Sequence, residues 1–262
     1  MITKPSIRTM LLTGLALWPL TLNAQGIEFA PELPLGDGTV RAFAEVAADG
    51  TPTRIGIEMT EEAIATLGPD MVFLTVPLPD AATEAGYDHV SLDWMPHGHA
   101  PGDLFGAPHF DVHFYLLTEA ERLAIDPAAP LFMEKAANRP TADLMPPNYV
   151  PPPELDPIPA MGEHWLDATD PVFSGRPFEA VMIYGAWDGA LIFAEPMVTR
   201  DLLLSQRDFG GNLGQPARVA QAVALPNAWS VSFDADRRVH VVSIDALEAR
   251  TPGDEAGGPE TN

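Results

Sequence analysis

Prolines constrain the fold of this chain more than any other residue type. The sequence has 28 prolines in 262 residues, and eight of them fall between positions 140 and 159. Proline has a fixed φ and no backbone N–H, so this stretch cannot form a helix or a central strand. Histidines of interest lie on both sides of it. We therefore interpret residues 138–160 as a loop that crosses a single domain, not as a boundary between two.

The rest of the chain has the pattern of short strands joined by turns. Asp49-Gly50 and Asp188-Gly189 are strong hairpin signals, and the unbroken apolar run at 71–78 predicts a buried strand. We expect an α+β fold, mainly antiparallel β, arranged as a curved sheet, a sandwich or an open barrel with a few short helices. The expected strands cover residues 39–48, 53–59, 71–78, 89–95, 109–117, 178–187, 190–196, 229–233 and 239–244.

Three threonines mark the expected helix starts. Thr60 and Thr199 suit the N-caps of short helices, and Thr118-Glu-Ala-Glu121 is a capping box that predicts a helix over 119–125. This helix decides the structure of the segment before it. A helix that begins at 119 cannot already be running at 109, and aromatic and β-branched residues dominate 109–117. That segment is therefore expected to be a strand.

The two ends of the chain differ from its centre. Residues 1–24 combine Lys4 and Arg8 with an apolar run and a small-residue site ending at Ala24, which is typical of a secretory signal peptide. The chain has no cysteine, so it has no lipid attachment site. We expect a single domain over 25–250, a disordered tail over 251–262, and a periplasmic or secreted protein.

The net charge limits the possible partners. The chain carries a formal charge of −23 at pH 7, whereas nucleic acids and anionic membrane surfaces attract clustered Lys and Arg. We expect no nucleic-acid partner and no membrane contact after signal cleavage. A small-molecule ligand and a homo-oligomer both remain open.

Five of the seven histidines fall between positions 97 and 164. Neutral imidazole is the commonest protein ligand for transition metals, and the lack of cysteine indicates a site of nitrogen and oxygen donors. We expect a divalent metal, with zinc as the first choice and copper, nickel or iron as alternatives. The five candidate metal ligands are His97, His99, His109, His113 and His164.

Strand geometry restricts how these histidines combine. In a strand, His109, Asp111 and His113 share one face, but positions 109 and 113 are roughly 13 Å apart. Metal–nitrogen bonds are about 2 Å long, so one ion cannot reach both rings. His97 and His99, with a glycine between them, are expected to converge. The preferred set is this pair, one histidine of the strand, and His164 as a fourth candidate.

Two acidic residues are the candidate catalytic groups. Asp111 orients a histidine or binds the ion itself. Glu195, at the end of an apolar strand, is a sheet-edge residue, a ligand or a general base. Three histidines plus a water would form an open site of the catalytic type, suited to hydrolysis or hydration, whereas four protein ligands would form a closed structural site.

A non-enzymatic interpretation stays open beside this one. In it, the histidines form a hydrogen-bonded structural network within a periplasmic binding or envelope-stress module. Other catalytic signatures are missing from the sequence, because it has no nucleophile elbow, no P-loop and no dinucleotide-binding glycine pattern. Whether the protein is an enzyme is therefore not decided by motifs.

Four motifs carry a resemblance to a known family. They are His97-Gly-His-Ala-Pro101, Pro108-His-Phe-Asp-Val-His-Phe-Tyr115, Met161-Gly-Glu-His-Trp165 and Glu195-Pro-Met197. With them, residues 35–245 resemble the TTHB210-like domain family of exported bacterial proteins. The resemblance implies an exported β-rich domain with a shared histidine-rich site, and it implies no particular activity.

Overall fold

The structure is a computed structural model that describes residues 26–254. The predicted signal peptide and all but the first four residues of the predicted tail lie outside this range. The described chain forms two antiparallel sheets with six short helices, and these strands do not close into a barrel. The expected α+β class, mainly antiparallel β, is therefore confirmed. No described helix has the length and apolar character needed to cross a membrane.

The first sheet, sheet A, combines the two ends of the described chain. Its strand order is β1-β3-β4-β14-β13-β12, with β2 paired to β3. The turn predicted at Asp49-Gly50 joins β3 to β4, and the last hairpin is longer than its sequence pattern indicated. The strands are β1 (Gly26–Phe29), β2 (Leu33–Leu35), β3 (Gly38–Val46), β4 (Pro52–Thr60), β12 (Phe209–Asn212), β13 (Val223–Asp234) and β14 (Val239–Arg250).

The second sheet, sheet B, holds the central part of the chain in the order β5-β6-β7-β11-β10-β9-β8. The Asp188-Gly189 hairpin joins β10 to β11, and both residues have the positive φ that such a turn requires. The proline-rich loop contributes only the two-residue edge strand β8. The strands are β5 (Val72–Pro77), β6 (His89–Met95), β7 (His109–Tyr115), β8 (Tyr149–Val150), β9 (Glu163–Asp167), β10 (Ala180–Trp187) and β11 (Ala190–Thr199).

The burial expected for residues 71–78 is wrong. The segment does form β5, but β5 is the edge strand of sheet B, and Val76 is its only buried residue. Phe73 is 58% exposed. An apolar run has the same sequence pattern in a central strand and at an edge, so the run alone cannot distinguish the two.

The helices are short. Three of them, α1, α4 and α6, begin at the predicted threonine caps, whereas α2, α3 and α5 have no side-chain cap and were not predicted. Thr60 and Thr199 accept hydrogen bonds from the first turns of α1 and α6, and Thr118 and Glu121 form the complete capping box of α4. The helices are α1 (Glu61–Thr66), α2 (Asp80–Glu84), α3 (Gly102–Phe105), α4 (Glu119–Leu123), α5 (Phe132–Ala137) and α6 (Arg200–Leu204), and the 3-10 turns are η1 (Ala142–Leu144) and η2 (Pro171–Ser174).

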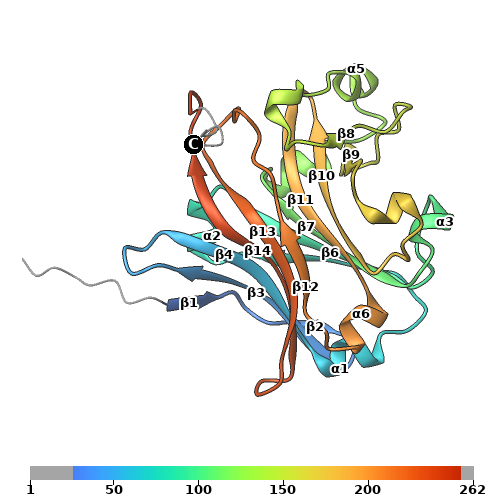
Figure 1. Ribbon diagram of the computed structural model, residues 1–262, viewed down its shortest axis with the longest axis vertical. Helices are drawn as coiled ribbons and strands as arrows, with labels where there is room; N and C mark the ends of the chain where they lie inside the picture. Colours follow the sequence, from blue (N-terminus) through green and yellow to red (C-terminus); the bar gives the residue numbers. More distant parts are fainter. Residues whose placement is uncertain (1–25, 255–262) are drawn as a thin grey trace, which may run out of the picture.

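Sheet B is covered on both faces. Its inner face packs on sheet A, and side chains of both sheets form one large apolar core. On its outer face, Phe105 of α3 and Phe132 of α5 belong to two smaller apolar clusters that include residues of β7, β10 and β11. Figure 1 shows α3, α5 and the segment around β8 and β9 on the side of sheet B that faces away from sheet A. His109, Asp111, His113 and Glu195 on this outer face are therefore buried.

Candidate metal centre

Strand β7 separates apolar from titratable side chains. Phe110, Val112 and Phe114 belong to the core between the sheets. His109, Asp111 and His113 alternate with them and so point to the outer face of sheet B, where all three are buried. The predicted strand and its facing pattern are thus present. The loops and helices on this outer face turn the polar stripe into an interior site.

The first group of possible ligands consists of His99, His109 and Asp111. His99 comes from the loop between β6 and α3. Its Nε2 lies 3.5 Å from Oδ2 of Asp111, and Nε2 of His109 lies 3.0 Å from Oδ1 of the same carboxylate. His109 and Asp111 are buried, whereas His99 is partly exposed. Two imidazoles and one carboxylate therefore converge from a strand and one adjoining loop.

Backbone carbonyls set the orientation of both rings in the first group. Nδ1 of His99 lies 2.9 Å from the carbonyl oxygen of Ala100, and Nδ1 of His109 lies 2.6 Å from that of Ala107. In a neutral ring, the nitrogen beside a carbonyl carries the proton, and the other nitrogen then presents a lone pair. Both Nε2 atoms thus point toward the carboxylate of Asp111.

The second group consists of His113, His164 and Glu195. Nε2 of His113 lies 3.4 Å from Oε1 of Glu195, and Nε2 of His164 lies 3.5 Å from Oε2. These residues come from β7, β9 and β11. Nε2 of His113 and Oε2 of Glu195 are buried and have no hydrogen-bond partner. The second group repeats the composition of the first, two imidazoles and one carboxylate, but all three residues lie on strands.

Asp93 is a member of this cluster that sequence reasoning missed. It lies on β6 opposite Asp111 of β7, and its Oδ2 is 3.9 Å from Nδ1 of His113. The Ser91 hydroxyl donates to its Oδ1 at 2.9 Å. Burial raises the pKa of Asp93 to about 7. The available signal was an acid in a mostly apolar strand, on the same alternating face as Ser91.

Burial and neighbouring charges shift the pKa values of Asp111 and Glu195 in opposite directions. Burial tends to raise the pKa of Asp111, but the contacts with His109 and His99 outweigh it and lower that pKa below its usual range. Burial raises the pKa of Glu195 well above normal, and the charges of Asp111 and Asp93 raise it further. Among the described residues, no Lys or Arg forms an ion pair with Asp111 or Glu195.

Burial and contact with acids also shift the pKa values of the histidines. Contact with Asp111 raises the pKa of His99. Burial lowers the pKa of His113 to about 3 and that of His164 to about 4. These two rings are therefore neutral at physiological pH. Neutral imidazole is the form that binds metal ions.

The predicted histidines do not all come together. His97 is exposed and belongs to neither group. Gly98, between His97 and His99, has a φ of +63°, so the chain turns sharply there and only His99 faces the carboxylates. His109 and His113 fall into different groups, as their separation along a strand predicts. His164, Asp111 and Glu195 each belong to one group.

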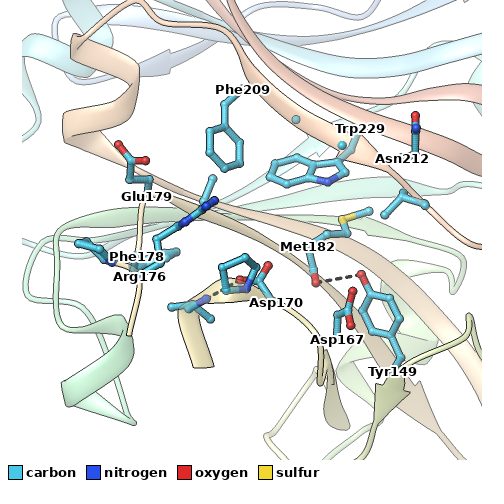
Figure 2. Close-up of a pocket in the computed structure, with 17 residues that line it drawn as sticks. Tyr149, Asp167, Asp170, Arg176, Phe178, Glu179, Met182, Phe209, Asn212 and Trp229 are labelled. Atoms are coloured by element: carbon cyan, nitrogen blue, oxygen red, sulfur yellow. Dashed lines mark hydrogen bonds between the residues drawn. The ribbon is translucent and has the colours of Figure 1, made fainter. Parts of the chain in front are cut away.

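A cavity of about 200 Å³ lies away from these groups. It opens between β9 and β10 of sheet B and β12 and β13 of sheet A. Figure 2 shows the rings of Phe209 and Trp229 on one side of it, with Asp170 and Tyr149 on the other. The Tyr149 hydroxyl donates to the carbonyl oxygen of Met182 at 3.1 Å. None of the seven predicted site residues lines this cavity.

One part of the chain matches a known family model. The TTHB210-like family model, described as hypothetical protein TTHB210, matches residues 48–94. The resemblance to that family is confirmed over this segment, which runs from the turn before β4 into β6. It contains Asp93 but none of the seven predicted site residues. Searches of curated proteins and of solved structures found no match.

Proposed function

We propose that this protein binds a divalent cation, zinc in the first instance, through Nε2 of His99, Nε2 of His109 and a carboxylate oxygen of Asp111. The observation that carries this proposal is the orientation of the two imidazoles. Their Nδ1 atoms face backbone carbonyls, so their Nε2 lone pairs face an anion. A cation between the three donors converts this repulsion into coordination.

The separations within the group support this assignment. Zinc binds imidazole nitrogen and carboxylate oxygen at about 2.0–2.2 Å, and tetrahedral angles then place two ligand atoms about 3.3 Å apart. The observed contacts of His109 and His99 with Asp111 are 3.0 and 3.5 Å. The backbone carbonyls also act as the outer partners that metal-bound histidines commonly have.

The same contacts argue against a structural hydrogen-bond network. A network would leave its buried polar atoms paired. Instead, Nε2 of His109 and Oδ1 of Asp111 are buried and have no hydrogen-bond partner, although they lie 3.0 Å apart. Burial without pairing is costly for such groups, and a bound cation removes the cost.

Three protein ligands leave a coordination position for water. An ion held by two histidines and one carboxylate lowers the pKa of a bound water and polarises carbonyl groups. We therefore assign this centre to hydrolytic or hydration chemistry. His99 is the partly exposed member of the group, and it places the open position toward solvent. We also propose that the protein is exported, which rests on the signal-like pattern of residues 1–24.

Metal analysis of the purified full chain tests this proposal. The protein is first stripped of metal by chelation and dialysis. Zinc, copper, nickel or ferrous iron is then added separately, and the bound metal per chain is measured by inductively coupled plasma mass spectrometry. We expect His99→Ala and Asp111→Asn to lose one ion, and His97→Ala, which changes the exposed neighbour, to retain it. Equal metal content in all of these variants would overturn the assignment. Cobalt substitution then tests the open position, because an added anion shifts the cobalt spectrum only when a ligand position is exchangeable.

A further inference from the structure

We infer that His113, His164 and Glu195 form a second cation site, separate from the first. This goes beyond the proposed function, which concerns the ion at Asp111 alone. Nε2 of each histidine lies 3.4–3.5 Å from an oxygen of the Glu195 carboxylate, close to the spacing of about 3.3 Å expected between tetrahedral zinc ligands. The three ligand atoms lie within 4.8 Å of one another.

The burial of His113 and Glu195 is the second independent observation, while His164 is 19% exposed. The side chains of His113 and Glu195 are 1% and 2% exposed. Among the described residues, Glu195 lies within ion-pair distance only of these two imidazoles, and no Lys or Arg reaches it. A buried carboxylate needs a proton, a charged partner or a metal. Two neutral imidazoles that aim nitrogen atoms at it provide the donor set of a metal.

The register of sheet B explains how His164 reaches Glu195. His164 of β9 is opposite Gly185 of β10, and Gly185 is opposite Phe193 of β11. A Cβ atom at Gly185 would lie 2.1 Å from the Phe193 ring. With no side chain there, the ring packs over β10, and the imidazole of His164 lies 5.3 Å from it, centroid to centroid. Gly185 thus leaves the space in which His164 approaches the neighbouring strands.

Asp93 lies next to the group but forms no hydrogen bond with it. Its carboxylate faces Nδ1 of His113 at 3.9 Å, while Nε2 of the same ring faces Glu195. A carboxylate on the far nitrogen of a metal-bound histidine fixes the ring orientation and raises its basicity. In the first group, backbone carbonyls take this position. The two groups differ at this point, because hydrogen bonds orient both rings of the first group, whereas Asp93 is too far from His113 to form one.

The two ions are expected to act separately. Asp111 and His113 are neighbours on one face of β7, and same-face positions are roughly 6.6 Å apart along a strand. Ions that share a bridging oxygen lie about 3.5–4 Å apart. The second ion is therefore not the partner of the first in a bridged centre. It connects β7, β9 and β11 inside the layer that covers sheet B, and we assign it a stabilising role.

Native mass spectrometry of the full chain, reconstituted with zinc alone, tests this inference by counting bound ions. The wild type is expected to bind two. Glu195→Gln, which preserves size, and His164→Ala are expected to bind one, as is His99→Ala. The double variant His99→Ala/Glu195→Gln is expected to bind none, and His97→Ala two. Circular dichroism of each zinc-free variant identifies any that fails to fold.

The outcomes separate the two proposals. A wild type that binds one ion, lost on changing His99 but kept on changing Glu195, would overturn the second site and leave the first intact. One ion lost in either variant would mean a single shared site and would also overturn it. A wild type that binds two ions, of which Glu195→Gln loses one and His99→Ala loses none, would overturn the first site and leave the second.

Discussion

Oδ1 of Asp111 lies 3.0 Å from Nε2 of His109, yet these buried atoms share no hydrogen bond. The reason is the carbonyl of Ala107, which holds Nδ1 of the same ring at 2.6 Å and so directs the lone pair of Nε2 toward the carboxylate. In the neutral ring with its proton on Nδ1, these two atoms are both electron-pair donors, which is the arrangement that a bound cation requires. The predictions below follow from this arrangement and from the packing around it.

Replacement of Asp111 by Asn is expected to weaken zinc binding at the first site by more than 100-fold. The change keeps the shape but removes the anionic ligand, and even changes to outer partners commonly weaken binding about 10- to 100-fold. Competition titration with a zinc-sensitive dye measures the affinity. His97→Ala is the matched control, since His97 is exposed in the same loop region. An affinity unchanged in Asp111→Asn would show that the carboxylate does not bind the ion.

Zinc is expected to raise the thermal stability of the chelated protein. At a free zinc concentration about 100 times the dissociation constant, a single site adds about 2.7 kcal/mol to the free energy of unfolding. For a domain of this size, this corresponds to a rise in Tm of about 5–10 °C. Differential scanning fluorimetry with and without zinc measures it. Magnesium is the control ion, because it prefers oxygen ligands in octahedral geometry, and an equal shift with both ions would argue against these sites.

Acid is expected to release the metal. Imidazole must lose its proton to bind an ion, and contact with Asp111 raises the pKa of His99 in the metal-free protein. A raised pKa means that the proton is held to higher pH, so competition grows as pH falls through neutrality. Zinc affinity measured at pH 7.5, 6.5 and 5.5 should therefore decrease at each step. Affinity that is constant over this range would exclude histidine ligands.

Gly185→Ala is expected to destabilise the fold by about 1–3 kcal/mol, because overpacking a buried site forces its neighbours to shift. The new Cβ would meet the Phe193 ring at 2.1 Å. Gly102→Ala is the matched control, since a Cβ there has no heavy atom within 4 Å, and we expect an effect within about 0.5 kcal/mol. Urea denaturation measures both. Equal stabilities would mean that the Phe193 ring moves freely.

Export with removal of residues 1–24 is expected when the full chain is expressed in a bacterium with a periplasm. Cleavage after Ala24 leaves Gln25 as the first residue. The mass of the protein recovered from the periplasmic fraction measures the cleavage site. Full-length protein confined to the cytoplasm would contradict the interpretation of this segment as a signal peptide.

Local sequence patterns predicted the longer strands and the three threonine-capped helices, because caps and turns act within a few residues, but they did not predict β9, which holds His164. The capping box at Thr118 identified both α4 and, by exclusion, the strand that holds Asp111. The alternation along β7 placed His109 and His113 on one face, and their separation along the strand predicted that they would not share an ion. They fall in different groups.

Features that depend on strand order could not be predicted in the same way. Asp93 enters the site because β6 pairs with β7, and His164 enters because Gly185 leaves space across β10. Neither relationship is local in the sequence. The expected convergence of His97 with His99 failed for a different reason. The close spacing of His97 and His99 indicated convergence, but the positive φ of Gly98 directs only one of the two rings inward.

Anomalous diffraction at the zinc edge, from crystals of the zinc-loaded full chain, tests the central claim most directly. The account predicts an anomalous peak within about 2.2 Å of Nε2 of His99, Nε2 of His109 and an oxygen of Asp111. Zinc-loaded crystals that have no peak between these three atoms, or whose only peak lies beside His97, would contradict it.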